Sequence, residues 1–165
     1  MRTSAFTLIE LMIVIVIIGI AAGLVLPGFQ QSTDTQLRAA AQILVADLEY
    51  AQTESRVHGD DLRLVVFDPA AGSYFLAASS APATPIAHPI DKKPYRIRWG
   101  QGRAHRLADV TLGGLSLGGD DQVKFGVYGQ LDQTTDGLIR LAAGPRSIEI
   151  TLDAISGAAS IGPVQ

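Results

Sequence analysis

The sequence predicts an α+β fold, with one long N-terminal helix packed on an antiparallel β-sheet head. Two changes in the pattern of apolar residues along the 165-residue chain support this prediction. Residues 6–29 are almost entirely apolar, and residues 33–58 have apolar positions at three- and four-residue steps, as in an amphipathic helix. After Gly59 the apolar positions alternate, and turn residues separate short β-type segments.

The apolar segment at residues 6–29 is predicted to be a membrane-spanning helix. Leu11 to Leu26 is a run of sixteen residues without a polar side chain, and residues 6–9 extend it to roughly the 20 residues that cross a hydrocarbon core. A cleavable secretory signal has a shorter apolar core, and a buried helix of a soluble domain is seldom so rich in Ile and Val. Because Arg2 precedes the segment, the positive-inside rule places the N-terminus in the cytoplasm and the rest of the chain outside.

Residues 33–58 are predicted to continue the helix along the head. One apolar stripe recurs at helical spacing: Leu37, Ala40, Ala41, Leu44, Leu48 and Ala51. A second stripe, at seven-residue spacing, widens the face expected to be buried: Ile43, Tyr50 and Val57. Charged residues such as Asp47 are expected away from this face. His58 and Gly59 predict the end of the helix, because Gly can adopt the left-handed cap.

The head is predicted to be mostly antiparallel β. Residues 62–67 and 73–78 are typical of a hairpin, with a turn at residues 68–72. Residues 79–94 contain four prolines and are predicted to form a loop, because proline cannot donate a ladder hydrogen bond. Further strands are predicted at residues 95–99, 110–117, 123–128, 138–142, 148–152 and 158–161.

The composition argues against catalysis, metal binding and disulfides. The chain has no cysteine, and His58, His88 and His105 have no metal-ligand spacing with one another. It contains no nucleophile, phosphate-binding or zinc-protease motif, so we expect no enzyme activity, no catalytic residue, no cofactor and no metal. Four aspartates could offer oxygens to Ca²⁺, but they lack the spacing of a known calcium loop and we interpret them as solvated turn residues. They are Asp120, Asp121, Asp132 and Asp136.

Residues 92–106 concentrate positive charge in a chain whose net charge is -3. Six of the thirteen Lys and Arg residues lie there, interleaved with Tyr95 and Trp99, a composition that nucleic-acid surfaces use. The alternation of Arg96 and Arg98 with apolar residues fits a half-buried strand equally well. We favour a surface for a protein partner, because Arg and Trp are enriched at interfaces. Its candidate residues are Arg96, Arg98, Trp99, Arg103 and Arg106.

The N-terminal string S-A-F-T-L-I-E-L-M-I-V-I-V-I-I-G-I resembles the N-terminal motif of type IV pilins and type II secretion pseudopilins. The resemblance implies that a prepilin peptidase cleaves between Ala5 and Phe6 and that Phe6 is then N-methylated. Glu10 is the fifth residue after this cut, as in the family, and is expected to set the register of assembly. Pro27 is the twenty-second, where the family's helix commonly kinks. Ala5 departs from the Gly that usually precedes the cut.

The rest of the chain resembles the GspH/FimT family of minor pseudopilins and minor pilins. The alanine-rich helix AAQILVADLEYAQTES precedes a hairpin, Phe125 and Gly129 fit the opening of the family's C-terminal pattern, and Ser156 and Gly157 fit its final turn. This resemblance implies a pilin-like fold and the role of an H-type minor pseudopilin, a structural subunit of the type II secretion pseudopilus that takes part in protein export. The alternative is a FimT-like minor pilin of a type IV or competence pilus, with DNA contact as an additional role.

These expectations divide the chain into a prepilin leader at residues 1–5, a transmembrane and assembly helix at residues 6–29, and a head at residues 30–165 that includes the amphipathic half of the helix. The expected location is the bacterial inner membrane, with a single pass and a periplasmic head, followed by assembly into a periplasmic pseudopilus. The expected partners are the prepilin peptidase, the membrane, and other pseudopilins, major and minor, through their N-terminal helices. Nucleic acid is not expected. A solitary membrane-anchored periplasmic binding protein is the alternative from another class.

Overall fold

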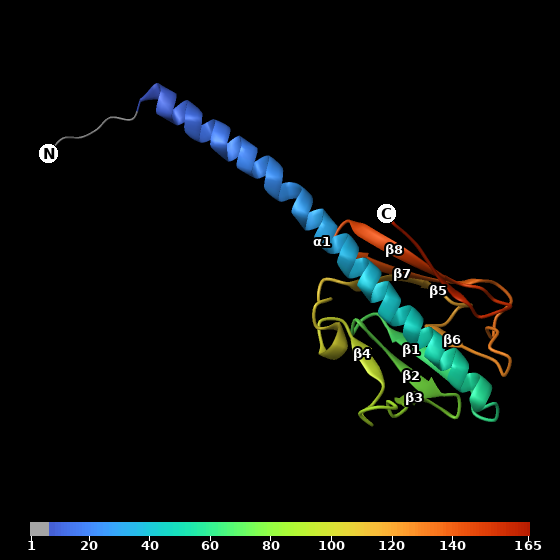
Figure 1. Ribbon diagram of the computed structural model, residues 1–165. Helices are drawn as coiled ribbons and strands as arrows, with labels where there is room; N and C mark the ends of the chain where they lie inside the picture. The colour runs from blue at the N-terminus through green and yellow to red at the C-terminus, as the bar shows by residue number, and fades with distance from the viewer. Residues whose placement is uncertain (1–6) are drawn as a thin grey trace.

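The computed structural model describes the backbone of residues 7–165, and the side chains of that range except those of residues 21–32. One α-helix, α1 (Leu8–Val57), runs for 50 residues, and its N-terminal half projects away from a β-sheet head (Figure 1). The helix ends where the sequence predicts, because the backbone N–H of His58 donates to the carbonyl oxygen of Glu54 and Gly59 follows. Among the residues that were described in full, no helix has a window long and apolar enough to cross a membrane.

Two antiparallel sheets form the head. The first has five strands, in the order β3-β2-β1-β6 with β4 also paired to β2: β1 (Arg63–Asp68), β2 (Ser73–Ala78), β3 (Ala81–Pro85), β4 (Arg96–Arg98) and β6 (Gln122–Lys124). The second has four strands, in the order β5-β7-β8-β9: β5 (Thr111–Ser116), β7 (Gly137–Ala143), β8 (Arg146–Leu152) and β9 (Ala159–Val164). A short 3-10 helix, η1 (Gly102–Ala104), follows β4. The α+β fold class predicted from the sequence is confirmed.

The proline-rich residues 79–94 depart from the prediction. Residues 81–85 form β3, an edge strand that pairs with the end of β2 across a β-bulge. An edge strand needs ladder hydrogen bonds on one side alone, so Pro82 and Pro85 can be accommodated there. The prediction of a loop is therefore wrong at residues 81–85.

The apolar stripe of α1 forms the centre of the hydrophobic core. α1 contacts β1 of the first sheet and β7, β8 and β9 of the second, so the stripe is buried against both sheets. The predicted stripe is confirmed, since all its members are at most 1% exposed: Leu37, Ala40, Ala41, Leu44, Leu48 and Ala51. In the second stripe Ile43 and Tyr50 pack against the core, whereas Val57, the last residue of the helix, is 70% exposed. The prediction that Val57 is buried is therefore wrong.

The C-terminal end of α1 holds two loops of the head together. The side-chain amide of Gln52 donates to the carbonyl oxygens of Gly129 (2.7 Å) and Ser156 (2.8 Å). Gly129 and Gly157 both have positive φ, of 85° and 69°. A Cβ added at Gly157 would collide with the carbonyl oxygen of Gly129 and with the Gln52 amide. The turn at Gly157 thus depends on a backbone approach too close for any side chain.

Replacing Gly157 with alanine is expected to destabilise the head far more than replacing Gly144. Both residues have positive φ (69° and 57°), which costs an L-residue about 1–2 kcal/mol. An added Cβ at Gly144 has no atom within 4 Å, whereas the collision at Gly157 adds about 1–3 kcal/mol.

This comparison can be made by urea unfolding of a chain that begins at residue 30. Every buried core residue that the structure describes lies at or beyond Leu37, so this shorter chain keeps the core. Equal unfolding midpoints for Gly157→Ala and Gly144→Ala would contradict the close approach.

Candidate assembly helix and partner surface

The N-terminal half of α1 exposes apolar side chains in every direction. Leu8 is 78% exposed and Ile20 is 62% exposed, and the large apolar residues between them are exposed by 44% or more. Figure 1 shows this half extending away from the head. A helix that is apolar all round is stable only where lipid or other protein covers it. This half of the helix is therefore a surface that lipid or another protein would cover.

The helix begins with a side-chain cap. The backbone N–H of Glu10 donates to the Thr7 hydroxyl oxygen (3.3 Å) and to the Thr7 carbonyl oxygen (3.1 Å). The sequence signal for this cap, which our prediction missed, is the capping-box spacing from Thr7 to Glu10. Glu10 is exposed in the first turn, where a carboxylate complements the positive end of the helix dipole.

Three of the predicted N-terminal positions are not tested by the structure. Ala5 and Phe6 lie outside the described residues. α1 is continuous through position 27, but the side chain of Pro27 is among those not described, and the kink there stays a prediction.

An ion pair fixes the place where α1 joins the head. The guanidinium of Arg146 donates to both carboxylate oxygens of Asp34, each at 3.0 Å. Asp34 lies on α1 and Arg146 is the first residue of β8. Such a two-point contact adds geometric restraint as well as attraction, so it orients the helix relative to the second sheet.

The basic segment forms a half-buried strand. Tyr95, Ile97 and Trp99 are 5–7% exposed, whereas Arg96 and Arg98 are exposed. This alternation follows from the two-residue period of a strand. Trp99 was expected on a partner surface, but the period directs its side chain into the core, where its ring packs 5.7 Å from that of Tyr74. Trp99 is a core residue and does not contribute to an exposed surface.

Three arginines of the basic segment line a hollow beside β4. The hollow has a volume of about 370 Å³ and is lined by Arg96, Ile97, Arg98, Gln101, Gly102 and Arg103. The Arg96 guanidinium also lies over the ring of Phe75, 4.6 Å from its centroid. Arg106 is exposed but does not line the hollow. The structure therefore brings Arg96, Arg98 and Arg103 together, and their role in binding a partner stays a prediction.

Arg103 also contacts a buried carboxylate. Asp47, on α1, is 1% exposed and accepts hydrogen bonds from the hydroxyls of Tyr74 (2.6 Å) and Tyr95 (2.9 Å) and from the Arg103 guanidinium. The prediction that Asp47 lies off the buried face is wrong, because these three donors replace its hydration. Its position three residues after Leu44, on the apolar stripe, is the sequence signal that could have placed it in the core.

Burial and the Asp47 carboxylate both change the pKa values of the groups that surround Asp47. Burial, followed by the negative charge of Asp47, raises the pKa of Tyr74 well above its ordinary value. The same two causes, in the same order, raise the pKa of Tyr95 to about 12. Burial alone would lower the pKa of Arg103, but its hydrogen bond to Asp47 raises it. At neutral pH the cluster therefore holds two neutral phenols and a charged guanidinium around the carboxylate.

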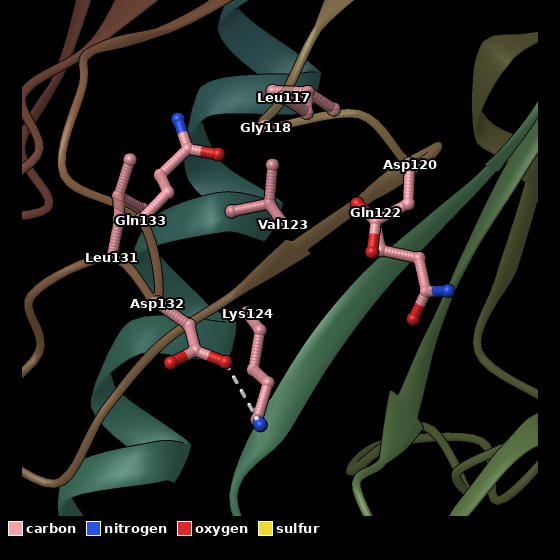
Figure 2. Close-up of a pocket in the computed structure, with 9 residues that line it drawn as sticks. All are labelled: Leu117, Gly118, Asp120, Gln122, Val123, Lys124, Leu131, Asp132 and Gln133. Carbon is pink, nitrogen blue, oxygen red and sulfur yellow. Dashed lines mark hydrogen bonds and ion pairs between the residues drawn. The ribbon is translucent and has the colours of Figure 1, made fainter.

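Two of the four turn aspartates, Asp120 and Asp132, line a small cavity beside β6. Figure 2 shows this cavity, of about 110 Å³, with Asp120, Gln122 and Lys124 among its lining residues. Lys124 Nζ pairs with the Asp132 carboxylate at 3.0 Å. Asp136 lies elsewhere and accepts the backbone N–H of Ala154 at 2.9 Å. Within residues 7–165 no group of three His, Asp or Glu side chains is placed to hold a metal ion.

The free energy of unfolding is expected to fall as the pH rises from about 10 to 12. Over this range the unfolded chain loses phenolic protons that the folded chain retains, because folding raises the pKa of Tyr74 and Tyr95. The limiting slope is about 1.4 kcal/mol per pH unit for each tyrosine.

Tyr95→Phe should therefore flatten this pH dependence while lowering stability at pH 7 by about 1 kcal/mol through the lost hydrogen bond. Tyr128→Phe is the matched control, since Tyr128 is 85% exposed, and it should keep the wild-type slope. Urea unfolding at a series of pH values gives both quantities. An unchanged slope in Tyr95→Phe would show that Tyr95 does not titrate as stated.

Comparisons with known proteins find one match to the N-terminal segment and another to the fold. Residues 1–26 match the family described as the prokaryotic N-terminal methylation motif. No curated protein sequence is similar to the chain at a significant level. The head and helix are similar to the type IV minor pilin FimU of Pseudomonas aeruginosa in two crystal forms. In space group P21 the TM-score is 0.57 at 16% identity, over 78% of this chain and 90% of FimU.

The second crystal form, in space group P65, gives a TM-score of 0.54 at 15% identity, over 77% of this chain and 93% of FimU. Identities this low establish the fold alone. The chain thus combines a fold similar to that of a type IV minor pilin with an N-terminal methylation motif.

Proposed function

We propose that the chain is an H-type minor pseudopilin, a structural subunit of a type II secretion pseudopilus that takes part in protein export. The observation that carries this proposal is the exposed apolar half of α1, which begins at the capped Thr7 and lies within the methylation motif. The apolar side chains of such a helix must be buried at both stages: in lipid before assembly, and against neighbouring helices in the filament. In this proposal the head has a structural role and no enzymatic one.

The proposed location is the bacterial inner membrane. Residues 6–29 anchor the chain, the leader at residues 1–5 faces the cytoplasm, and the head at residues 30–165 lies in the periplasm. The positive charge of Arg2 before the apolar segment supports this orientation. A prepilin peptidase then removes the leader, Phe6 is methylated, and the helix joins those of other pseudopilins.

A minor pilin of a type IV pilus is the second candidate, and the similarity of the fold to FimU favours it. Both candidates need the same N-terminal helix and differ in the filament that takes up the subunit. Disruption of the gene distinguishes them: loss of protein secretion supports the pseudopilus, and loss of pilus-dependent functions with secretion intact supports the pilus. We do not propose nucleic acid as a partner, because a net charge of -3 disfavours approach to a polyanion.

In cells that contain a prepilin peptidase, the mature chain is expected to begin at Phe6 and to carry one added N-terminal methyl group. Mass spectrometry of the membrane fraction measures both changes. Ala5→Gly, which introduces the residue usual before the cut, should be processed at least as completely. A wild-type chain that still begins at Met1 would argue against the proposed processing.

Glu10→Leu is expected to leave membrane insertion and the folded head intact but to reduce incorporation into the filament more than a hundredfold. After cleavage, the N-terminal amine of one subunit can lie level with the Glu10 carboxylate of another. Each charge then offsets part of the other's desolvation, and the pair fixes the axial register. Removing one partner of such a buried pair costs about 3–5 kcal/mol.

Crosslinking to neighbouring subunits and secretion assays measure this effect. Met12→Leu is the matched control, because Met12 is 58% exposed on the same half of the helix and its replacement changes neither charge nor hydrophobic character. If Glu10→Leu assembles and supports secretion as well as the parent, the register role is wrong and Glu10 acts at most in processing.

A further inference from the structure

A groove with an excess of positive charge lies along the outer edge of β4. β4 pairs with β2 on one side, and no other strand of residues 7–165 pairs with it. The hollow of about 370 Å³ beside β4 adjoins a second one of about 360 Å³, and we call the two together the β4 groove. Lys93 lines one of the two hollows and Arg98 lines the other. Both hollows share four lining residues: Arg96, Ile97, Gly102 and Arg103.

Three cations of the β4 groove have no ion-pair partner in the molecule. Lys93, Arg96 and Arg98 are exposed, and none of them pairs with a carboxylate whose side chain the structure describes. Asp91 also lines the groove, and its carboxylate accepts the backbone N–H of Lys93 at 3.2 Å. Asp91 offsets one of the three charges at most. At least two positive charges are therefore left for a ligand that carries carboxylates of its own.

Two guanidinium groups of the groove are held in place before a ligand binds. Arg96 lies over the ring of Phe75, 4.6 Å from its centroid. Arg103 lies 5.5 Å from the ring centroid of Tyr95 and donates through Nη2 to the buried carboxylate of Asp47. Because a guanidinium has five N–H donors, Arg103 keeps further donors for a ligand. Side chains that are already ordered lose less conformational freedom when a ligand binds.

The ladder between β4 and β2 indicates the form of such a ligand. The backbone N–H of Trp99 donates to the carbonyl oxygen of Gly72 at 3.2 Å, so the odd-numbered residues of this segment turn their backbone groups toward β2. The backbone N–H of Arg98 therefore faces away from β2, at the open edge. Arg96 and Arg98 lie on one face of the strand, about 7 Å apart along it. An extended chain with carboxylates at alternate positions has the same spacing.

The β4 groove lies beside α1. Arg103, which lines both of its hollows, contacts Asp47 on the part of α1 that packs on the head. In the proposed filament, parallel helices bring the heads of neighbouring subunits to the sides of α1. A minor subunit occurs in few copies, so the chain that reaches this groove is a different subunit.

We infer that the β4 groove binds an extended acidic segment of a different pseudopilin, whose alternate carboxylates meet Arg96 and Arg98. The inference rests on the proposed function, because assembly into the filament is what brings that neighbour to the groove. The net charge of -3 and the carboxylates of Asp47 and Asp91 along the groove disfavour a long polyanion such as DNA. A short segment with two carboxylates avoids that repulsion, and complementary charges of this kind select one partner over others.

Photocrosslinking of the full chain in cells that assemble the filament tests this contact. The chain has no native cysteine, so Gln101→Cys, labelled with a benzophenone maleimide, places one photoreactive group in the groove without removing a charge. We expect a crosslink to a different pseudopilin. Mass spectrometry should locate it on a segment that has acidic residues at alternate positions.

Charge reversal then tests the chemistry of the contact. Arg96→Glu with Arg98→Glu should lower the crosslink at least tenfold, and replacing the two facing carboxylates of the partner with arginine should restore it. Restoration would also show that the reversed chain folds. Lys92→Glu with Arg106→Glu is the matched control, because it makes the same change of net charge at residues that line neither hollow of the groove. This control should keep the crosslink.

Each other outcome overturns the inference. A crosslink to a second copy of this chain, to an exported protein or to DNA would assign the groove to another partner. A crosslink that survives reversal of Arg96 and Arg98, or that the partner's arginines fail to restore, would exclude the paired charges. Absence of the crosslink with normal maturation at Phe6 and normal filament incorporation refutes this contact alone, whereas failure of maturation and incorporation refutes the proposed function and this inference with it.

Discussion

The burial of one helical stripe against two sheets is the constraint on which the structure depends. The residues from Leu37 to Ala51 form one apolar surface, and both sheets pack against it. Each turn of this stripe packs against both sheets. It therefore removes apolar surface of the helix and of both sheets from water. Because α1 is continuous from Leu8, the element that fills the core also carries the apolar half away from the head (Figure 1). The position of that half therefore depends on the packing of the head.

The same packing places Asp47 on the buried face of α1 and surrounds it with hydrogen-bond donors. A carboxylate on the buried face would be costly without partners, and the fold supplies Tyr74 from β2 together with Tyr95 and Arg103 from the segment around β4. These contacts link α1 to the least regular part of the head, which has one short strand and one 3-10 turn between β3 and β5. The cluster thus holds β4 at a fixed place on the helix, and with it the exposed Arg96 and Arg98.

The features that were predictable from the sequence are those with a local cause. The helical stripe and the β1–β2 hairpin depend on spacing and on turn residues within a few positions, so both were predicted. β3 was missed because an edge strand and a proline-rich loop have the same local pattern until the neighbouring strand is known. Asp47 and Trp99 were misplaced although each has a local signal, since Asp47 follows Leu44 by three residues and Trp99 alternates with Arg98. The distant partners that make a buried carboxylate possible, Tyr74 and Arg103, have no local signal. The roles of Phe6 and Glu10 come from a family resemblance and have no counterpart in periodicity or composition.

A helical filament is defined by an axial step and a rotation between its subunits, and a subunit that joins it must match both. In the proposed assembly, the charge at Glu10 acts along the helix axis, where a mismatch of one turn is about 5.4 Å. The rotation depends on which face of the head meets a neighbouring subunit. That face is fixed only if the head does not turn relative to the helix. The Asp34–Arg146 pair, the Asp47 cluster and the buried stripe connect α1 to both sheets, and together they remove that freedom.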